Sequence, residues 1–248
     1  MECTEKLYYT DAFLSKCVAT VTHIDGNKIY LDKTIAYPEG GGQIADTGIL
    51  IIDGKKIPFL DVQKGVGRPF ITQDFPVINL DTPIYHVVSE DDTSNFNVGD
   101  NINVIININR RIMTTVHHSA LHLALMFISD IRNDDIYNRL KGCSITETNA
   151  RLDFALSDKF SPEQIQYTQD SITEIIKNKE EVIVYPHKKE KEAWYWKCRE
   201  YICPCGGTHV TNTEQIGNVN VRRKGIGSGR ERLIVEVTNP ILSENYYH

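Results

Sequence analysis

The first 109 residues contain short runs in which apolar and polar positions alternate, the pattern of half-buried β-strands. Two pairs of such runs flank the dipeptides Asp25-Gly26 and Asp53-Gly54. Because Asp-Gly readily adopts the positive φ angles of a tight turn, each pair predicts a β-hairpin. A further alternating run covers residues 101–108, and no convincing helical pattern comes before residue 110. The pattern predicts an all-β domain, which we expect to be a small β-barrel.

Beyond residue 109 the apolar positions recur every three or four residues, which is the period of an α-helix. One helix is predicted from Arg110, with apolar positions at Met113, Val116, Ala120, Leu121, Ala124, Leu125 and Ile128. A second helix is predicted from Pro162 to about Lys179, with Ser161 as its N-cap. Residues 131–137 are expected to lengthen the first helix or the loop after it. Strands are expected at residues 150–154, 182–185, 219–223 and 232–237.

The change of period divides the chain into two predicted domains. Residues 1–109 form a glycine-rich β-barrel domain. Residues 110–248 form an α+β domain, with an antiparallel sheet and helices on one face. No long stretch rich in Pro, Gly or Ser separates the two, so we expect them to pack tightly against each other.

Composition narrows the class of protein. The chain has 248 residues, of which 41% are hydrophobic and 24% are charged, as in ordinary soluble proteins. Its first residues lack the basic start and apolar run of a secretory signal, and no apolar stretch approaches the length needed to span a bilayer. We therefore expect a cytoplasmic protein without membrane contact. We expect a monomer, because no unpaired apolar stripe demands a partner.

The net charge of −6 excludes a uniformly basic nucleic-acid-binding protein. It still allows a local basic patch, because the field near a surface depends on where its charges lie. The six cysteines of a chain without a secretory signal are expected to stay reduced. A cysteine near histidines is then a candidate metal ligand.

The segment HHSALH at residues 117–122 is the first candidate metal-binding segment. Residues four apart lie on the same face of a helix, so His118 and His122 can both reach one ion. His117 points about 100° away from that face. Such a pair is common on helices that bind no metal, so it is a weak signal by itself.

The segment CGGTH at residues 205–209 is the second candidate. Two glycines allow a tight turn with positive φ, which directs Cys205 and His209 toward one point. The alternative is an ordinary glycine turn with a buried cysteine and a surface histidine. Three histidines and one cysteine suit zinc, so the two segments together predict a Zn²⁺ site.

The type of zinc site stays open at this point. Four protein ligands would make a closed, structural site, whereas catalysis needs an open coordination position. The chain has no H-E-x-x-H motif, so the helix lacks the adjacent glutamate base of a zinc peptidase.

The third segment is YPEGGGQ at residues 37–43. Three consecutive glycines expose backbone groups and let another chain approach closely. No Lys-Ser or Lys-Thr pair follows, so the segment is not a P-loop for nucleotide phosphates. A flexible hairpin connection would also fit, but the flanking Pro, Glu and Gln favour a shaped loop.

These three segments, in the order YPEGGGQ, HSALH after Arg110 and Arg111, and CGGTHV, closely resemble the editing domain of alanyl-tRNA synthetase. The catalytic domain of the synthetase would precede this region. The chain is therefore expected to be similar to the AlaX family of free-standing alanyl-tRNA editing proteins, in its medium-length form. The resemblance spans nearly the whole chain. It implies hydrolysis of the ester in mischarged tRNA(Ala), chiefly Ser-tRNA(Ala) and in some members Gly-tRNA(Ala), with alanyl-tRNA left intact.

The resemblance also implies roles for individual residues. The zinc ligands and catalytic centre would be His118, His122, Cys205 and His209. The substrate pocket would be bordered by Glu39, Gly40, Gly41, Gly42 and Gln43. The family tends to have Thr or Gln near the glycine that follows the motif helix, and this chain departs from that pattern around Gly142. Thr146 is a substrate-binding candidate there, but the residue that senses the serine hydroxyl stays open. Contact with tRNA is expected from local positive charge at Arg110, Arg111, Arg222, Arg223 and Lys224.

Two other functions fit the same residues. The first is a tRNA-binding protein whose zinc is purely structural, which would bind tRNA without turnover. The second is a zinc hydrolase of another ester or amide, which would still cleave a small ester in the presence of excess tRNA.

Overall fold

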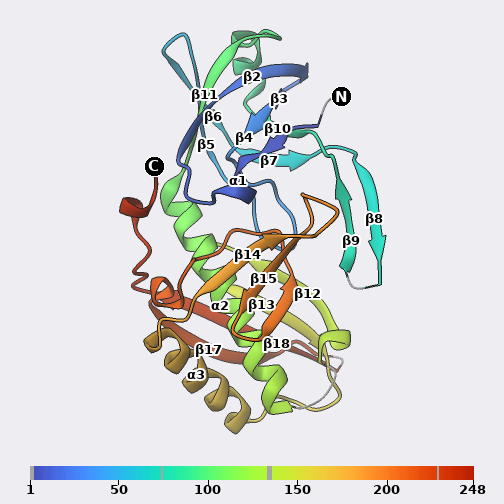
Figure 1. The fold of residues 1–248 in the computed structure, drawn as a ribbon, viewed down its shortest axis with the longest axis vertical. Helices are drawn as coiled ribbons and strands as arrows, with labels where there is room; N and C mark the ends of the chain where they lie inside the picture. The colour runs from blue at the N-terminus through green and yellow to red at the C-terminus, as the bar shows by residue number, and fades with distance from the viewer. Residues whose placement is uncertain (1–2, 74, 133–135, 228) are drawn as a thin grey trace.

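The computed structural model describes residues 3–73, 75–132, 136–227 and 229–248 and has a mixed α+β fold (Figure 1). Figure 1 shows a curved sheet from the first half of the chain at the top, with the main helices and further sheets below it. The long helix α2 (Ile108–Arg132) runs from the upper part into the lower part.

The first half is built on a seven-stranded antiparallel sheet with the order β6-β5-β11-β2-β3-β10-β7. Its strands are β2 (Lys16–Asp25), β3 (Lys28–Leu31), β5 (Gly48–Ile52), β6 (Lys55–Phe59), β7 (Asp61–Lys64), β10 (Ile84–Val87) and β11 (Asn101–Ile106). Both predicted hairpins are confirmed. Gly26 has a φ of +56° between β2 and β3, and Gly54 has a φ of +78° between β5 and β6.

Shorter elements flank this sheet. Strand β1 (Glu5–Lys6) pairs in parallel with β4 (Lys33–Thr34), and the single-turn helix α1 (Leu7–Thr10) follows β1. Helix α1 was not predicted, because four residues are too few to show a helical period. The 3-10 helices are η1 (Glu90–Asn95), η2 (Tyr137–Arg139), η3 (Thr213–Ile216) and η4 (Glu244–Tyr246).

The predicted barrel is not confirmed. Strands β6 and β7 form the two ends of the sheet, and in the described ranges they pair with β5 and β10 but not with each other. Residues 16–20 of β2 pair with β11, whereas residues 21–25 pair with β3, and the register shifts between Val21 and His23. This irregularity bends the sheet around a hydrophobic core of its own, but the sheet stays open.

A separate two-stranded ribbon, β8 (Arg68–Thr72) with β9 (Phe75–Leu80), lies between β7 and β10 in the chain. Figure 1 shows it descending at the right, beside the main body. Phe70, Phe75 and Leu80 of the ribbon pack with Ala193 of the second half. Only these few positions are buried, so the alternation in the sequence is too weak to predict the ribbon.

The second half contains a four-stranded antiparallel sheet with the order β12-β13-β18-β17. Its strands are β12 (Leu140–Ile145), β13 (Ala150–Ala155), β17 (Asn218–Gly225) and β18 (Arg230–Thr238). Helices α2 and α3 (Pro162–Lys177) pack against this sheet and against each other, as the α+β prediction requires. A three-stranded antiparallel sheet follows, with β14 (Val182–Pro186), β15 (Trp194–Cys198) and β16 (Tyr201–Pro204).

Helix α3 begins where the sequence predicts. The Ser161 hydroxyl accepts from the Gln164 N–H at 3.3 Å, and the Gln164 side-chain oxygen accepts from the Ser161 N–H at 3.0 Å. This capping box satisfies backbone donors that have no partner inside the helix. The predicted lengthening of α2 at residues 131–137 falls partly on residues 133–135, which lie outside the described residues.

Helix α2 is the central core helix of the second half. It is long and apolar enough to cross a membrane by length and composition, which corrects the expectation that no stretch comes near that length. However, 83% of its most apolar window is buried inside the protein. A buried core helix passes the same test, so α2 is weak evidence for a membrane span.

The two halves have separate hydrophobic clusters, one at residues 19–106 and one at residues 112–242. Helix α2 begins at Ile108, close to the predicted boundary at residues 109 and 110. The division into two domains at that boundary stays a prediction.

Arg111 connects α2 to the first half of the chain through an ion pair and hydrogen bonds. Its guanidinium group is fully buried, pairs with the Asp46 carboxylate, and donates to the backbone oxygens of Ala12 and Ile35. A side chain with no exposed surface, whose charge is already neutralised by Asp46, is not available to a phosphate. Arg111 holds the two halves together in this structure, and nothing here supports the predicted contact of this residue with tRNA, which stays a prediction.

Candidate metal centre

Helix α2 presents His118 and His122 on one face, as the four-residue spacing predicts. Their ring centroids are 5.0 Å apart and the rings are nearly parallel, at 22°. His117 points elsewhere, because its Nε2 atom accepts from the Val237 N–H at 3.1 Å and its Nδ1 atom donates to the Met113 oxygen at 2.9 Å. The prediction that His117 lies off the metal-binding face is confirmed.

The turn after β16 brings Cys205 and His209 to the same place. The Cys205 Sγ atom lies 3.4 Å from His118 Nε2 and 3.2 Å from His209 Nε2. One ligand atom from each of His118, His122, Cys205 and His209 lies within 4.8 Å of every other. The structure therefore brings together all four residues that the sequence singled out.

These separations fit a zinc ion. Nitrogen and sulfur ligands lie about 2.0–2.3 Å from a tetrahedral Zn²⁺, so they lie roughly 3.3–3.8 Å from one another. The donor set of three imidazoles and one thiol is one that zinc prefers. The residues present thus fit the metal in chemistry, and the two distances from Cys205, 3.4 and 3.2 Å, are close to this range.

The glycines of this turn prevent steric clashes. The sequence predicted a different reason for them, namely positive φ angles. Neither Gly206 nor Gly207 has a positive φ angle. A Cβ atom added at Gly207 would lie 2.1 Å from Cε1 of His118, and one added at Gly206 would lie 3.2 Å from the ring of Tyr9. The bare backbone at Gly207 lets the His118 ring pack directly against the turn.

The orientation of His118 is set by Gln43, from the glycine-rich segment. The Gln43 Oε1 atom lies 2.8 Å from His118 Nδ1 and also accepts from the Thr208 N–H at 3.2 Å. The Gln43 amide nitrogen donates to the Thr208 hydroxyl at 3.0 Å. Because Oε1 is an acceptor, Nδ1 of His118 carries the proton, and the lone pair on Nε2 points toward Cys205.

The orientation of His209 is set by Ser119. The Ser119 hydroxyl donates to the Thr115 oxygen at 3.0 Å and accepts from the Val210 N–H at 3.1 Å. Its remaining lone pair accepts from His209 Nδ1 at 3.2 Å, so Nε2 of His209 is left free to bind a metal.

Two residues that were not predicted hold His122. Its ring stacks on Trp196, with centroids 4.8 Å apart at 16°, and its Nδ1 atom lies 3.1 Å from the Sγ atom of Cys203. Trp196 is fully buried, so it is a packing residue and does not stack on a nucleotide base. Cys203 lies two positions before Cys205, and only that spacing could have drawn attention to it.

Burial controls the protonation of the centre. It lowers the pKa of His122 to about 4 and, with help from the neighbouring imidazoles, lowers the pKa of His118 and His209 well below the usual value. Burial raises the pKa of the Cys205 thiol to about 12. The three histidines are therefore neutral and ready to act as ligands near pH 7, whereas the thiol needs a nearby cation to ionise.

A cavity of about 680 Å³ opens beside the centre. His118, His122 and Cys205 line it, whereas His209 does not. Leu121, Leu125, Tyr137, Leu140, Ile145 and Leu152 form an apolar part of its wall. An ion held by the four residues would thus lie at the wall of a large, partly apolar cavity.

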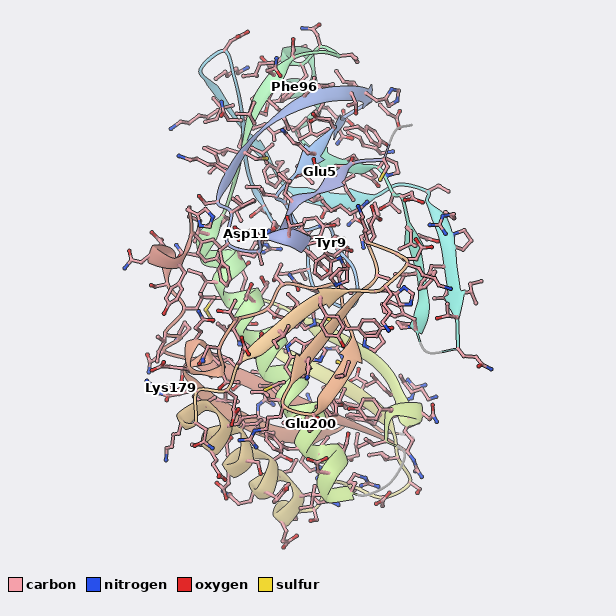
Figure 2. The ribbon with its side chains drawn as sticks, in the orientation of Figure 1. Glu5, Tyr9, Asp11, Phe96, Lys179 and Glu200 are labelled. Atoms are coloured by element: carbon pink, nitrogen blue, oxygen red, sulfur yellow. The ribbon has the colours of Figure 1, made fainter. Side chains whose placement is uncertain are left out.

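An aromatic pair closes another part of this wall. Tyr9 and Trp194 both line the cavity, and their rings stack with centroids 5.4 Å apart at 19°. Figure 2 shows Tyr9 between the curved sheet and the sheets below it. The cavity therefore lies where the two halves of the chain meet.

The glycine-rich segment lies against strand β12. The Ile145 N–H donates to the Gly42 oxygen at 2.7 Å, and the Ile44 N–H donates to the Ile145 oxygen at 3.1 Å. A Cβ atom added at Gly42 would lie 2.4 Å from the Sγ atom of Cys143, so a larger residue would push the segment off the strand. The segment is thus a shaped loop and extends the sheet at its β12 edge.

The predicted substrate-binding residues take different positions. Glu39, Gly40 and Gly41 line the cavity. Gln43 is fully buried, does not line the cavity and bonds His118, so a substrate-binding role for this residue stays a prediction. The Thr146 hydroxyl bonds the Asn149 oxygen within the β12–β13 turn and lies outside the cavity, so Thr146 has no contact with the predicted pocket in this structure.

The predicted tRNA-binding residues are spread over two places. Arg110 lies near the loop, where it donates to the Ala45 oxygen at 2.8 Å and pairs with Glu147. Apart from the buried Arg111, the others are on β17, the sheet edge opposite β12. There, Arg222 pairs with Glu236, Arg223 pairs with Glu231, and Lys224 is exposed.

Comparison with known proteins points to one family. Residues 195–234 match the family described as "Threonyl and Alanyl tRNA synthetase second additional domain". The chain is 28% identical to the alanine–tRNA ligase of Saccharolobus islandicus and 28% identical to that of Methanothrix thermoacetophila, over 89% and 94% of its length. It spans only a quarter of each ligase.

A shorter relative matches from end to end. The alanyl-tRNA editing protein AlaX-M of Pyrococcus horikoshii is 31% identical over 232 residues, which cover 93% of this chain and 96% of the relative. The motif segments and their arrangement around one cavity agree with this similarity. The chain therefore belongs to the AlaX family of alanyl-tRNA editing proteins.

Proposed function

We propose that the protein is a trans-editing hydrolase that deacylates mischarged tRNA(Ala), chiefly Ser-tRNA(Ala), with Gly-tRNA(Ala) as a second substrate. The observation that carries this proposal is the centre of three histidines and one cysteine at the wall of the cavity, in a chain of the alanyl-tRNA editing family. A first selection by size separates alanine poorly from glycine and serine, so a second, hydrolytic site is needed for fidelity.

The cofactor of this proposal is Zn²⁺, held by His118, His122, Cys205 and His209. When bound, zinc supplies Lewis acidity, which polarises an ester carbonyl. The protein's own contribution is positioning, because Gln43 and Ser119 fix the rings of His118 and His209 before any substrate arrives.

The cavity wall supports an ester substrate of this kind. Glu39, Gly40 and Gly41 border the cavity from the loop side, where the two glycines add no side chain to its wall. Leu121, Leu125 and Leu152 supply apolar surface to the same cavity. An activated aminoacyl ester needs little more than orientation, so a dedicated general base is unnecessary.

We further propose how the protein works as a whole. It acts in the cytoplasm as a monomer, with a β domain at residues 1–109 and an editing domain at residues 110–248. Arg110, Arg222, Arg223 and Lys224 supply positive charge for tRNA.

The first experiment measures deacylation of seryl-, glycyl- and alanyl-tRNA(Ala) by the wild-type protein and by the His122→Ala and Cys205→Ala variants, after circular dichroism shows that each is folded. We expect rapid loss of serine or glycine, spared alanine and inactive variants. If the protein binds zinc and tRNA but cleaves none of the three esters, the hydrolase proposal is wrong and a structural zinc is the better account. Cleavage of a small unrelated ester in the presence of excess tRNA would instead favour a different hydrolase.

A further inference from the structure

The ammonium group of Lys64 lies in the wall of the cavity. The sequence patterns did not mark this residue as functional. It is the last residue of β7, and side chains in a strand alternate between the two faces. Val62 points into the hydrophobic core, so Lys64, two residues later, leaves the sheet on the same side. The side chain then ends at the glycine-rich loop, where a Cβ atom added at Gly40 would lie 3.2 Å from Lys64 Nζ.

This ammonium group makes neither a hydrogen bond nor an ion pair with any part of the chain that the structure describes. The acidic side chain whose charge acts on it is Glu192, which is already engaged. One oxygen of Glu192 pairs with Lys6 at 2.6 Å, and the other accepts from the Asp81 N–H at 2.9 Å. Burial lowers the pKa of Lys64, and the positive charge of Lys6 lowers it further. A partly buried cation in this position is therefore stabilised by an incoming anion.

The proposed substrate has one anionic group near its ester. The carboxyl group of the amino acid is consumed in the ester bond, and its amino group is positive. The side chains of serine and glycine are neutral. The phosphate that joins the terminal nucleotide to the rest of the tRNA is thus the nearest negative charge, one nucleotide from the bond to be cleaved.

We propose that Lys64 binds the phosphate on the 5′ side of the terminal nucleotide while the ester lies at the metal centre. This inference rests on the proposed function. Lysine acts as a point charge toward phosphate, which suits a single ammonium on the cavity wall. Gly40, with no side chain, leaves space between Lys64 and the cavity.

The test compares binding of adenosine 5′-monophosphate and adenosine by titration calorimetry, since these two probes differ only in the phosphate. We expect the wild-type protein to bind the phosphate-bearing probe roughly tenfold more tightly, and Lys64→Gln to lose this preference. Lys64→Arg retains the positive charge and should keep most of the preference for the phosphate-bearing probe. Lys56→Gln, at an exposed position on β6, is the matched control and should behave as wild type.

Kinetics on seryl-tRNA(Ala) give a second readout, in which Lys64→Gln raises KM roughly tenfold and changes kcat much less. Equal affinity of the wild-type protein for both probes, or an unchanged preference in Lys64→Gln, overturns the proposal. Failure of the proposed function looks different, because the wild-type protein would then leave seryl-tRNA(Ala) intact whatever the binding preference of Lys64.

Discussion

The side-chain oxygen of Gln43 lies 2.8 Å from Nδ1 of His118, so a loop in the first half of the chain orients a metal-ligand candidate in the second half. Replacing Gln43 with Leu leaves the N–H groups of His118 and Thr208 without an acceptor. We expect zinc affinity to fall about 10–100-fold, the usual effect of losing a group that orients a ligand. Competition with a chromogenic chelator measures this, with Gln166→Leu on the exposed face of α3 as control. An unchanged affinity would show that the ring is oriented by packing alone.

A methyl group at Gly207 should displace the His118 ring, because the added Cβ would lie 2.1 Å from its Cε1 atom and 2.9 Å from Gln43 Oε1. We expect Gly207→Ala to lower the free energy of unfolding by about 1–3 kcal/mol and to weaken zinc binding. Urea unfolding and metal analysis are the measurements. Gly142→Ala is the matched control, since its added Cβ would meet no atom within 4 Å. Equal effects of the two substitutions would rule out the steric explanation.

Removing the Arg111 side chain should destabilise the folded protein, because the Asp46 carboxylate would remain buried without its partner. We expect Arg111→Met to lower the free energy of unfolding by about 3–5 kcal/mol. Arg222→Met breaks an exposed pair with Glu236 and should cost less than about 1 kcal/mol, but it should weaken tRNA binding. Chemical denaturation and filter binding separate the two effects. A small stability loss in Arg111→Met would contradict the role assigned to the buried pair.

His86 should make stability depend on pH. It is fully buried beside Thr34 and Phe59, and burial lowers its pKa from the usual 6.5 to about 4. The unfolded chain therefore binds the proton first, so stability is intact above about pH 6.5 and is lost as the pH falls toward 4. The protonation of His86 should lower the free energy of unfolding by about 3 kcal/mol.

The measurement for His86 is urea unfolding between pH 7.5 and 4.5, compared with the His86→Gln variant. As the pH falls, the free energy of unfolding of the wild type should decrease more than that of His86→Gln. His23→Gln, at an exposed position, is the matched control. A constant difference between wild type and His86→Gln would mean that His86 does not titrate in this range.

The parts of the fold and site that the sequence predicts are those with a local signal. The Asp25-Gly26 and Asp53-Gly54 turns, the capped start of α3 and the facing pair His118 and His122 depend on residues only a few positions apart. The joining of the histidine pair with Cys205 and His209 came from the chemistry of the ligand set and from the family resemblance.

The parts that sequence reasoning missed depend on contacts between distant residues. Gln43 lies among glycines that border the cavity, and nothing nearby in the sequence shows that it turns inward to a histidine 75 positions away. Arg111 looks like its neighbour Arg110 in the sequence, yet only Arg111 meets a buried carboxylate. Lys64 ends an ordinary strand, and its importance appears only when the loop at Gly40 lies beside it.

The pairing of the glycine-rich loop with β12 has a consequence for how the protein can be divided. An uncovered strand at the edge of a sheet offers free backbone groups to other chains and promotes aggregation. In this protein the backbone of Gly42 and Ile44 occupies part of the β12 edge at Ile145. A fragment beginning at α2 would lose that cover, so its β12 edge would be open to self-association.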